Sequence, residues 1–401
     1  MRTLVLFLIP LAFAVAWPLA ALLIRLGHKL GTFDSPGVPG QIKPAPRRVP
    51  NTGGIAIFVG IVLPLAVALA VMHPGITDFI QRAAWLPETW RTFAATNLAP
   101  HLAGIVSSAP QGWLLLASLA VLHVLGLIDD RRPLGPFLKL AIMAAPALAV
   151  PLVSTLAPGF APTRLLTLLD AHVGGPWLSI LLTALWFLVV TNALNFMDNM
   201  DGLSAGTACV AGAFFLVAAL LHGQWFVGAC LALIVGACLG FLMFNAPRAG
   251  GAKIIMGDSG SLVLGFLLAF LTVRTTYLAQ DDGGVTAGPW YSVLMPVVVL
   301  AVPLYDFFTV VLIRMRQGKS PFVGDMQHLS HRLNRLGLSR RASVQVIWGL
   351  AAVTGVSGIS LASLQPWQAA LVGVQLVVVL GVVGAFDYAG AKASAKQDHA
   401  A

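Results

Sequence analysis

Residues 175–221 read GPWLSILLTALWFLVVTNALNFMDNMDGLSAGTACVAGAFFLVAALL. Two apolar runs, 175–191 and 203–221, enclose a short segment that is rich in Asn and Asp. Each run approaches the roughly 20 residues that an α-helix needs to cross a bilayer. Because backbone polar groups in lipid must be bonded within the chain, such runs predict helices. The stretch therefore predicts two membrane helices joined by a polar turn.

The same pattern extends along the whole chain. Apolar runs of spanning length lie at 4–26, 54–72, 113–128, 136–153, 175–191, 203–221, 226–244, 260–273, 291–313, 344–363 and 368–386. We expect an all-α polytopic membrane protein with about 11 transmembrane helices, ten or twelve being the alternatives. The first run is expected to be a retained span rather than a cleaved signal peptide. A single domain over 1–388 and a disordered tail over 389–401 are predicted.

Composition points the same way. Of 401 residues, 58% are hydrophobic and 10% are charged, and the mean hydropathy is +0.87. Soluble domains carry about 25% charged residues. An ordinary cytosolic enzyme, a disordered chain and a coiled coil are therefore excluded. The three cysteines, Cys209, Cys230 and Cys238, lie inside apolar runs and show neither a disulfide framework nor metal-binding spacing.

The net charge of +9 follows membrane topology rather than a nucleic-acid face. Lys and Arg collect in short gaps between apolar runs, so no nucleic-acid partner is expected. If the gap 27–53 and every second gap after it are cytoplasmic, few of the 24 Lys and Arg lie elsewhere. Those exceptions are Arg2, Arg82, Arg91, Arg164 and Arg274. This bias predicts an outside N-terminus and an inside C-terminus.

The expected cytoplasmic gaps hold most of the polar residues. Lys43 lies in the first gap, which either binds phosphate or is a topological stop; taken alone, the stop is favoured. Asp129 and Asp130 end a run and suit an Mg²⁺ ligand or a base, or a helix-end charge paired with Arg131 or Arg132. Adjacent side chains on a helix diverge by about 100°, so one Asp could face a metal and the other a substrate.

The gap between 192 and 202 has a regular spacing. Asn192, Asn195 and Asp198 recur every third residue and share one face if the helix continues, and Asp201 extends the series. Polar groups at a membrane helix end are costly without a partner. This spacing predicts a functional cluster.

Two later gaps and one intramembrane residue complete the set. Asp258 lies between glycines ahead of an apolar run, as an N-cap or beside an anion-binding helix end. In the last large gap, Asp325, His328 and His331 are spaced by three and would stack on one side of a helix. His and Asp are zinc ligands, but the nearby cations favour a surface for phosphate or pyrophosphate. Asp306, inside a predicted span, is functional or a structural partner.

Acidic and basic groups on one membrane face suit phosphoryl transfer from a soluble diphosphate to a lipid acceptor. The segments 129–130, 192–203, 256–262 and 320–333 together resemble the polyprenyl-phosphate N-acetylhexosamine-1-phosphate transferase family. Order and spacing match from about residue 40 to residue 345. The resemblance implies ten or eleven helices, a cytoplasmic catalytic cleft, and Mg²⁺ with Mn²⁺ as a substitute. It also implies transfer of a sugar 1-phosphate from a UDP-sugar to a polyprenyl phosphate, with release of UMP.

The resemblance implies roles for individual residues. Asp129 matches the base that deprotonates the lipid phosphate, although another proposal makes a motif Asp a covalent nucleophile. Asp130 matches the acidic residue near the metal and lipid phosphate. Asp258 matches the main Mg²⁺ ligand, and Asn195 an amide close to it. Asp201 matches a uracil contact, Asp198 the nucleotide or sugar cleft, and His328 and His331 the histidine motif that holds the diphosphate and sugar. The candidate substrate-binding residues are Lys43, Asn192, Asn195, Asp201, Arg314, Arg316, Lys319 and Arg332.

The sequence departs from the family pattern at two places, and the first of them bears on the function. Ser330 stands where related sequences carry a histidine, which argues against phospho-N-acetylmuramoyl-pentapeptide transferase. The outer loop over 73–112 is longer than expected. The expected partners are a UDP-N-acetylhexosamine (UDP-GlcNAc first), undecaprenyl phosphate and the bacterial inner membrane, with a homodimer as one assembly. The pentapeptide transferase and a lipid or phosphate transporter are the alternatives.

Overall fold

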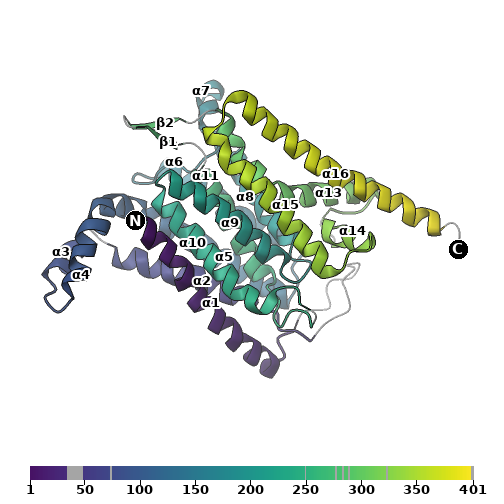
Figure 1. The fold of residues 1–401 in the computed structure, drawn as a ribbon, viewed down its shortest axis with the longest axis horizontal. Coiled ribbons are helices and arrows are strands. Elements are labelled where there is room, and N and C mark those ends of the chain that lie inside the picture. The colour runs from purple at the N-terminus through teal and green to yellow at the C-terminus, as the bar shows by residue number, and fades with distance from the viewer. Residues whose placement is uncertain are drawn as a thin grey trace.

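Long α-helices dominate the structure, a computed structural model that describes residues 1–33, 48–72, 75–248, 250–275, 278–281, 284–287, 290–321 and 324–398. Figure 1 shows them as a tilted bundle. In chain order the α-helices are α1 (Arg2–Leu30), α2 (Gly53–Val71), α3 (Ile76–Arg82), α4 (Glu88–Phe93), α5 (Leu102–Arg131), α6 (Pro136–Leu156), α7 (Asp170–Val173), α8 (Trp177–Phe196), α9 (Leu203–Leu221), α10 (Trp225–Asn245), α11 (Asp258–Thr275), α12 (Met295–Val299), α13 (Ala301–Arg316), α14 (Leu329–Arg335), α15 (Arg340–Ser360) and α16 (Pro366–Asp398). The short elements are η1 (Ala94–Leu98), η2 (Ala99–His101), η3 (Thr167–Leu169), η4 (Trp290–Leu294), η5 (Leu361–Ser363) and the antiparallel hairpin β1 (Leu278–Asp281) and β2 (Gly284–Ala287).

The helices confirm the predicted multi-pass fold. Within the described residues, 10 helices are long and apolar enough to cross a membrane, or up to 11 if a bent pair is one span. These are α1, α2, α5, α6, α8, α9, α10, α11, α15 and α16, with α12 and α13 as the bent pair. The hairpin of β1 and β2 is the departure from an all-α chain in the part that the structure describes. The protein is therefore a multi-pass membrane protein, and the orientation of its termini stays a prediction.

The predicted span 291–313 is broken rather than straight. Tyr291–Val299 and Ala301–Arg316 meet at an angle of 71°. Pro303 lies at the start of α13, where it cannot donate a hydrogen bond and its ring crowds the carbonyl four residues back, at Val299. This proline accounts for the break at Leu300. As a result, α13 leaves the direction of the bundle, and Asp306 lies on the second limb.

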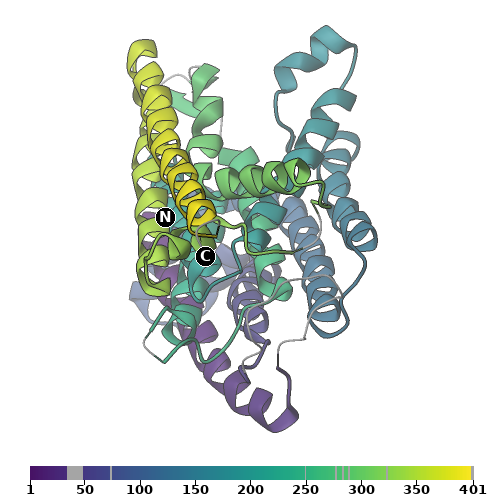
Figure 2. The ribbon, with the colours of Figure 1, turned by 90° about the vertical axis from the view of Figure 1, so that its right-hand side faces the viewer.

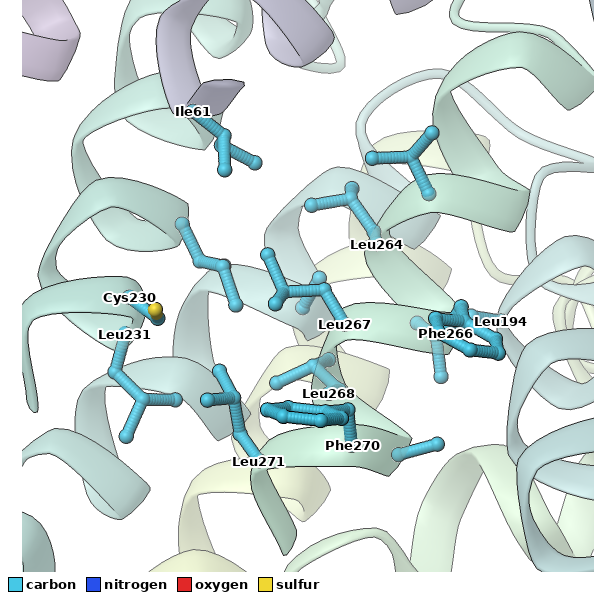
Figure 3. Close-up of a cluster of buried hydrophobic side chains, with 14 of the residues drawn as sticks. Ile61, Leu194, Cys230, Leu231, Leu264, Phe266, Leu267, Leu268, Phe270 and Leu271 are labelled. Carbon is cyan, nitrogen blue, oxygen red and sulfur yellow. The ribbon is translucent and has the colours of Figure 1, made fainter. Parts of the chain in front are cut away.

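Helix α11 is the centre of the bundle. Its residues from Ser259 to Val273 are all buried, with α2, α5, α8, α9 and α10 around it. Figure 3 shows Leu264, Phe266, Leu267 and Leu271 of this helix in the core, with side chains of the surrounding helices. A helix that is hydrophobic on all sides is stable only when enclosed in this way. Any polar group at its first turn is therefore held by a well-packed support.

Other helices face outward. Helix α16 exposes Trp367, Leu371, Val377 and Phe386, and Figure 2 shows it along one flank of the bundle. Exposed apolar side chains on a spanning helix fit contact with lipid. Helix α16 continues to Asp398 through Ala- and Lys-rich sequence that favours helix, whereas the sequence suggested a disordered tail after 388.

The long outer loop holds helical structure. Helices α3 and α4 and the short η1 and η2 occupy the interval before α5, which begins at Leu102 rather than near residue 113. In Figure 1, α3 and α4 lie to one side of the bundle. The polar residues that were singled out in the sequence and that the structure describes lie elsewhere, around the C-terminal ends of α5, α8 and α13 and the N-terminal end of α11. We call this the site end.

Candidate active site

Three carboxylates and one ammonium converge at the site end. Asp129 and Asp130 come from the last turn of α5, Lys139 from the first turn of α6, and Asp258 begins α11. Lys139 Nζ lies 3.1 Å from Asp129 Oδ2 and also contacts Asp258 Oδ2. These four residues are called the acidic cluster below. Because the cluster contains one cation and three carboxyl groups, a further positive charge near it would be attracted.

The two adjacent aspartates point in different directions, as the helix spacing predicted. Asp129 turns to Lys139 and accepts the Leu134 N–H at 2.7 Å. Neither carboxylate takes the expected helix-end pairing with Arg131 or Arg132 in any contact that the structure gives it. Asp129 is thus held between α5 and α6, next to the carboxylate of Asp258.

Asp130 caps the central helix from outside. Its Oδ1 accepts the Asp258 N–H at 2.9 Å, and its Oδ2 accepts the Ser259 N–H at 3.2 Å. Asn51 Nδ2 adds a third donor at 3.3 Å from Oδ1. The first N–H groups of a helix have no partner within the helix, and a carboxylate there also interacts favourably with the helix dipole. Asp130 therefore fixes the backbone from which Asp258 projects.

Close helix packing makes this cap possible. A Cβ on Gly126 of α5 would come within 2.3 Å of Ser259 N, and one on Gly54 of α2 within 2.3 Å of Gly260 N. Gly257 has φ +69°, and a Cβ there would meet the Asp130 carboxylate at 2.6 Å. Glycine is thus required at these positions so that α2 and α5 can approach the start of α11.

Asn195 connects α8 to the acidic cluster. Its Nδ2 donates to Asp258 Oδ1 at 2.8 Å and to Ser261 Oγ at 3.0 Å. Asn192, Asn195, Asp198 and Asp201 were expected to share one face only if the helix continued, and the helix does not continue as far as Asp198. Helix α8 ends at Phe196, and residues 197–202 form a turn in which Gly202 has φ +77°.

Asn192 and Asp201 have hydrogen-bond partners outside the acidic cluster, unlike Asn195. Asn192 Nδ2 bonds the Leu188 carbonyl of its own helix at 2.8 Å. Asp201 accepts the Ala252 N–H at 2.9 Å and so joins the turn to the segment before Asp258. Asp198 is half-buried in the same turn.

A second group of residues surrounds the loop between α13 and α15. We call residues 317–332 the histidine loop; the structure describes it apart from 322 and 323. Arg314 of α13 is 2% exposed, and its guanidinium bonds Asp325 Oδ1 at 2.9 Å and the Pro321 carbonyl at 2.8 Å. His328 Nδ1 lies 2.9 Å from Asp306 Oδ2. The loop is therefore attached to α13 at several points.

The expected helical stack of Asp325, His328 and His331 is wrong. Helix α14 begins at Leu329 with His328 as its N-cap residue, so Asp325 lies before the helix. Asp325 turns to the buried Arg314, because a buried guanidinium needs an anionic partner. Arg314 thus holds the loop, while Arg316 and Lys319 are exposed at the same end.

The two groups meet at the end of α8. The ring of Phe196 packs edge-on against His328 at 5.5 Å between centroids, and Arg314 Cζ lies 5.3 Å from the centre of the same ring. Three residues later, Asn199 Oδ1 accepts a hydrogen bond from Ser330 Oγ. The segment from Asn195 to Asn199 therefore contacts the acidic cluster on one side and the histidine loop on the other.

Burial and charge set the ionisation of the histidine loop. Burial, and then the charge of the neighbouring His328, lowers the pKa of His331 to about 4. His331 is therefore a neutral imidazole at neutral pH. Burial acts to raise the pKa of Asp325, but the hydrogen bond and charge of Arg314 outweigh it and hold that pKa below its ordinary value. Asp325 thus remains an anion.

Two carboxylates of the acidic cluster could hold a divalent cation only together with other ligands. Asp129 and Asp258 already approach one ammonium together, which shows that both carboxylates can face a single positive charge. Among the described residues, no group of three or more His, Cys, Asp or Glu is arranged so that it could hold a metal ion by itself. Mg²⁺ usually binds through one or two carboxylates together with water and substrate phosphates, so an open set of oxygen ligands suits it.

The structure adds residues that the sequence reasoning missed. Lys139 lies inside an apolar run and was not singled out in the sequence, although an ionisable residue in a span calls for a named partner. Asn51 was missed because polar loop residues carry no spacing signal. Lys43 lies outside the described residues. Arg332 is 7% exposed and donates to the Gln327 carbonyl at 2.9 Å.

Comparisons with known proteins follow the same segments. The profile described as glycosyl transferase family 4 matches residues 112–276, which include α5, α8 and α11. A decaprenyl-phosphate N-acetylglucosaminephosphotransferase of Mycobacterium tuberculosis is 33% identical over 83% of this chain and 77% of its own length. A probable undecaprenyl-phosphate N-acetylglucosaminyl 1-phosphate transferase of Bacillus subtilis is 28% identical over 90% of this chain and 85% of its own.

An enterobacterial relative gives the same result. The undecaprenyl-phosphate alpha-N-acetylglucosaminyl 1-phosphate transferase of Escherichia coli is 25% identical over 84% of this chain and 78% of its own length. These matches cover both the acidic cluster and most of the bundle that supports it. The chain therefore belongs to glycosyl transferase family 4, the polyprenyl-phosphate N-acetylhexosamine-1-phosphate transferases.

Proposed function

We propose that this protein transfers N-acetylglucosamine 1-phosphate from UDP-GlcNAc to undecaprenyl phosphate, releasing UMP and starting a lipid-linked glycan. The relatives named above are described as polyprenyl-phosphate N-acetylglucosamine-1-phosphate transferases, and their similarity extends over most of this chain. The observation that carries the proposal is the acidic cluster, in which Asp129, Asp258 and Lys139 meet at the start of a buried helix.

The reaction is a phosphoryl transfer. An oxygen of the lipid phosphate attacks the sugar-bearing phosphorus of UDP-GlcNAc, and a new P–O bond forms. The P–O bond between the two donor phosphates breaks, and its electron pair leaves with UMP. Any proton on the attacking phosphate passes to a base. Catalysis of such transfers rests on positioning and on stabilisation of spread negative charge.

Asp129 is the proposed base. Its Oδ2 is paired with Lys139 and its Oδ1 with the Leu134 N–H, so the carboxylate is fixed in position. Lys139 holds Asp129 and Asp258 side by side and brings a positive charge to the place where phosphates would meet. Both effects follow from residues on α5, α6 and α11. This arrangement supports direct attack by the lipid phosphate.

We propose Mg²⁺ as the cofactor, with Asp258 and Asn195 as the residues that would hold it. When bound, Mg²⁺ would neutralise charge on the donor diphosphate and on departing UMP. Asn195 donates to Asp258 Oδ1 and so fixes the direction of that carboxylate. Asp130 fixes the backbone of the same residue through the helix cap. The ligand residue is thus oriented by two partners.

The histidine loop is the proposed contact for the diphosphate and sugar. Arg316, at the end of α13, and Lys319, in the loop, are exposed, whereas Arg314 and Arg332 are buried and bonded within the loop and α13. We therefore assign phosphate contact to the exposed pair and loop positioning to the buried pair. The proposed setting is the bacterial inner membrane with the site end facing the cytoplasm, where UDP-sugars are found; a homodimer is left to measurement.

A purified-protein assay tests the proposal. Full-length protein in lipid nanodiscs would receive UDP-GlcNAc, undecaprenyl phosphate and Mg²⁺, and UMP and lipid-linked sugar would be measured. We expect both products to require lipid, metal and Asp258, with EDTA and Asp258→Ala as the controls. A product from the muramoyl-pentapeptide donor but not from UDP-GlcNAc would replace the proposed donor. No product across a panel of UDP-sugars would refute the transferase and favour the transporter.

A further inference from the structure

Asp306 is a buried carboxylate that the proposed reaction does not use. It lies on α13, is 2% exposed, and directs both of its oxygens at the start of α14. Oδ1 accepts the Leu329 N–H at 2.6 Å, and Oδ2 lies 2.9 Å from His328 Nδ1. One carboxylate therefore binds the backbone and the side chain of two consecutive residues.

We infer that Asp306 is a positioning residue that sets the orientation and the tautomer of His328 for the donor substrate. The inference rests on the proposed function, because it takes the histidine loop as the contact for the diphosphate and sugar. Asp306 itself does not touch substrate in this account. It acts through the imidazole of His328.

Hydrogen-bond chemistry decides the tautomer. A carboxylate oxygen only accepts, so the hydrogen bond from His328 requires a hydrogen on Nδ1. In a neutral ring this leaves Nε2 with a lone pair and makes it the only nitrogen free to accept. In a protonated ring Nε2 is a donor to phosphate. In the neutral form, the partner of Nδ1 therefore decides what Nε2 offers.

Packing fixes the plane of the ring as well. The edge-on ring of Phe196 lies at 90° to the His328 ring, and the ring of His331 lies 6.4 Å away. His328 is itself buried, with 6% exposure. The ring is therefore confined between α8, α13 and α14, and Asp306 supplies the polar contact that specifies one ring orientation over its flipped alternative.

The other attachments of the loop do not replace this contact. Arg314 bonds Asp325 and Pro321, which precede His328 by at least three residues. Arg332 Nη2 lies 3.2 Å from Thr309 Oγ1, one turn beyond His328. These contacts hold the loop near α13, but none of them involves a ring nitrogen of His328, so they do not determine its tautomer. Asp306 alone among the contacts given for this ring carries that choice.

The substitution Asp306→Asn isolates the effect. An amide has nearly the same size, but only its oxygen accepts hydrogen bonds, whereas its NH₂ group donates them. If the oxygen keeps the Leu329 N–H, the NH₂ group faces His328 Nδ1, which must then accept. The hydrogen moves to Nε2, and the group offered to substrate is reversed.

Histidine NMR tests the tautomer without reference to activity. Full-length protein with ¹⁵N-labelled histidine would be recorded in nanodiscs, and the His328 signal, one of nine histidines, would be identified by its loss in His328→Gln. We expect an Nδ1–H signature in the parent protein and an Nε2–H signature in Asp306→Asn. An Nε2–H ring in the parent, or an unchanged signal in Asp306→Asn, would overturn the inference.

A double-mutant cycle tests the consequence for UMP release. We expect Asp306→Asn to lower kcat by about 10- to 100-fold in the parent background. In the His328→Gln background the same change should add almost nothing, because both act through one ring. Additive losses would show that Asp306 merely supports the fold. Asp170→Asn, the same substitution in the ion pair with Arg164 beyond the far end of α8, serves as the matched control and should leave kcat unchanged.

The two experiments separate the possible failures. If the parent protein forms no UMP with any donor, the proposed function fails, and the NMR result still decides the role of Asp306. If the parent is active but the cycle is additive, only the inference about Asp306 fails. Melting temperatures of all variants would be measured alongside. Asp306→Glu, which keeps two acceptor oxygens, would be recorded as the conservative variant. It should keep the Nδ1–H signal even if Asp306→Asn unfolds, and an Nε2–H signal in Asp306→Glu would overturn the inference.

Discussion

The acidic cluster and the histidine loop lie at the same end of the molecule but are supported in different ways. The acidic cluster is carried by the ends of α5, α6 and α11, and α11 is buried along its length. The histidine loop is not built on a buried helix of this kind. It is held in place by side-chain bonds to Asp306, Thr309 and Arg314 of α13. Groups that hold a metal and a base need rigid placement, whereas a loop can adjust to a sugar and a nucleotide.

The contrast is tested most strongly at Lys139. Lys139→Ala removes the cation between Asp129 and Asp258 and leaves their charges to repel each other. We expect the rate of UMP release to fall on the order of 10³-fold, similar to the loss of a group that stabilises developing charge. Lys29→Ala, an exposed lysine at the end of α1, is the matched control. Near-normal activity of Lys139→Ala would mean that the acidic cluster is not the reaction centre.

Neighbouring aspartates allow a finer test within the acidic cluster. Asp129→Asn removes the proposed base but keeps an acceptor for the Leu134 N–H, so kcat should fall on the order of 10²-fold with a small change in Tm. Asp130→Asn leaves one N–H of the first turn of α11 facing an NH₂ group. We expect it to destabilise the protein by about 1–2 kcal/mol and to lower kcat less. Kinetics and thermal unfolding would be measured on both variants. A larger loss of kcat in Asp130→Asn and a larger loss of stability in Asp129→Asn would mean that Asp130 is the base and Asp129 the structural residue.

Sequence reasoning located the acidic cluster better than the histidine loop, for a physical reason. Long apolar runs specify membrane helices, and the polar residues at their ends follow, which placed Asp129, Asp130 and Asp258 together. A loop carries no such periodicity. Asp325 was assigned to a helix with His328 because the spacing fitted, but the buried charge of Arg314 draws it away. Lys139 was missed because a single lysine at a helix end usually reaches into solvent.

The break at Leu300 shows a related limit. Hydropathy places a single span over 291–313, yet the backbone turns by 71° there. The signal was Pro303, whose effect on the preceding turn is local and well understood. That turn places Asp306 beside His328 rather than among core helices. What looked like an intramembrane charge in the sequence is therefore an attachment point for the histidine loop.

His331 in the histidine loop should make the stability of the protein depend on pH. The pKa of His331 is lowered to about 4 in the folded protein, mainly by burial, whereas an unfolded histidine titrates near 6.5. Between these values the unfolded chain binds the proton and the folded chain does not, so stability decreases as pH falls from about 6.5 towards 4. Tm would be measured over this interval in the parent and in His331→Gln. The variant should lose less stability on acidification; equal slopes would remove His331 as the cause.

The smallest expected effect lies at the contact between the two regions. Ser330 Oγ donates to Asn199 Oδ1, and Asn199 is four residues from Asn195, which holds Asp258. Ser330→Ala removes that bond and should destabilise the protein by about 0.5–1.5 kcal/mol. Ser330 is 1% exposed, so a histidine at this position would have to displace its neighbours and should cost more.

A second serine makes this last test specific. Ser343 Oγ donates to Asn334 Oδ1 at 2.8 Å and is fully buried between α14 and α15, away from the turn that carries Asn199. Ser343→Ala should therefore have a similar cost in unfolding free energy. Only Ser330→Ala should also raise KM for the UDP-sugar, because it frees the turn that joins the histidine loop to the acidic cluster. If both variants leave KM unchanged, the two regions act independently, and Ser330 has only a packing role.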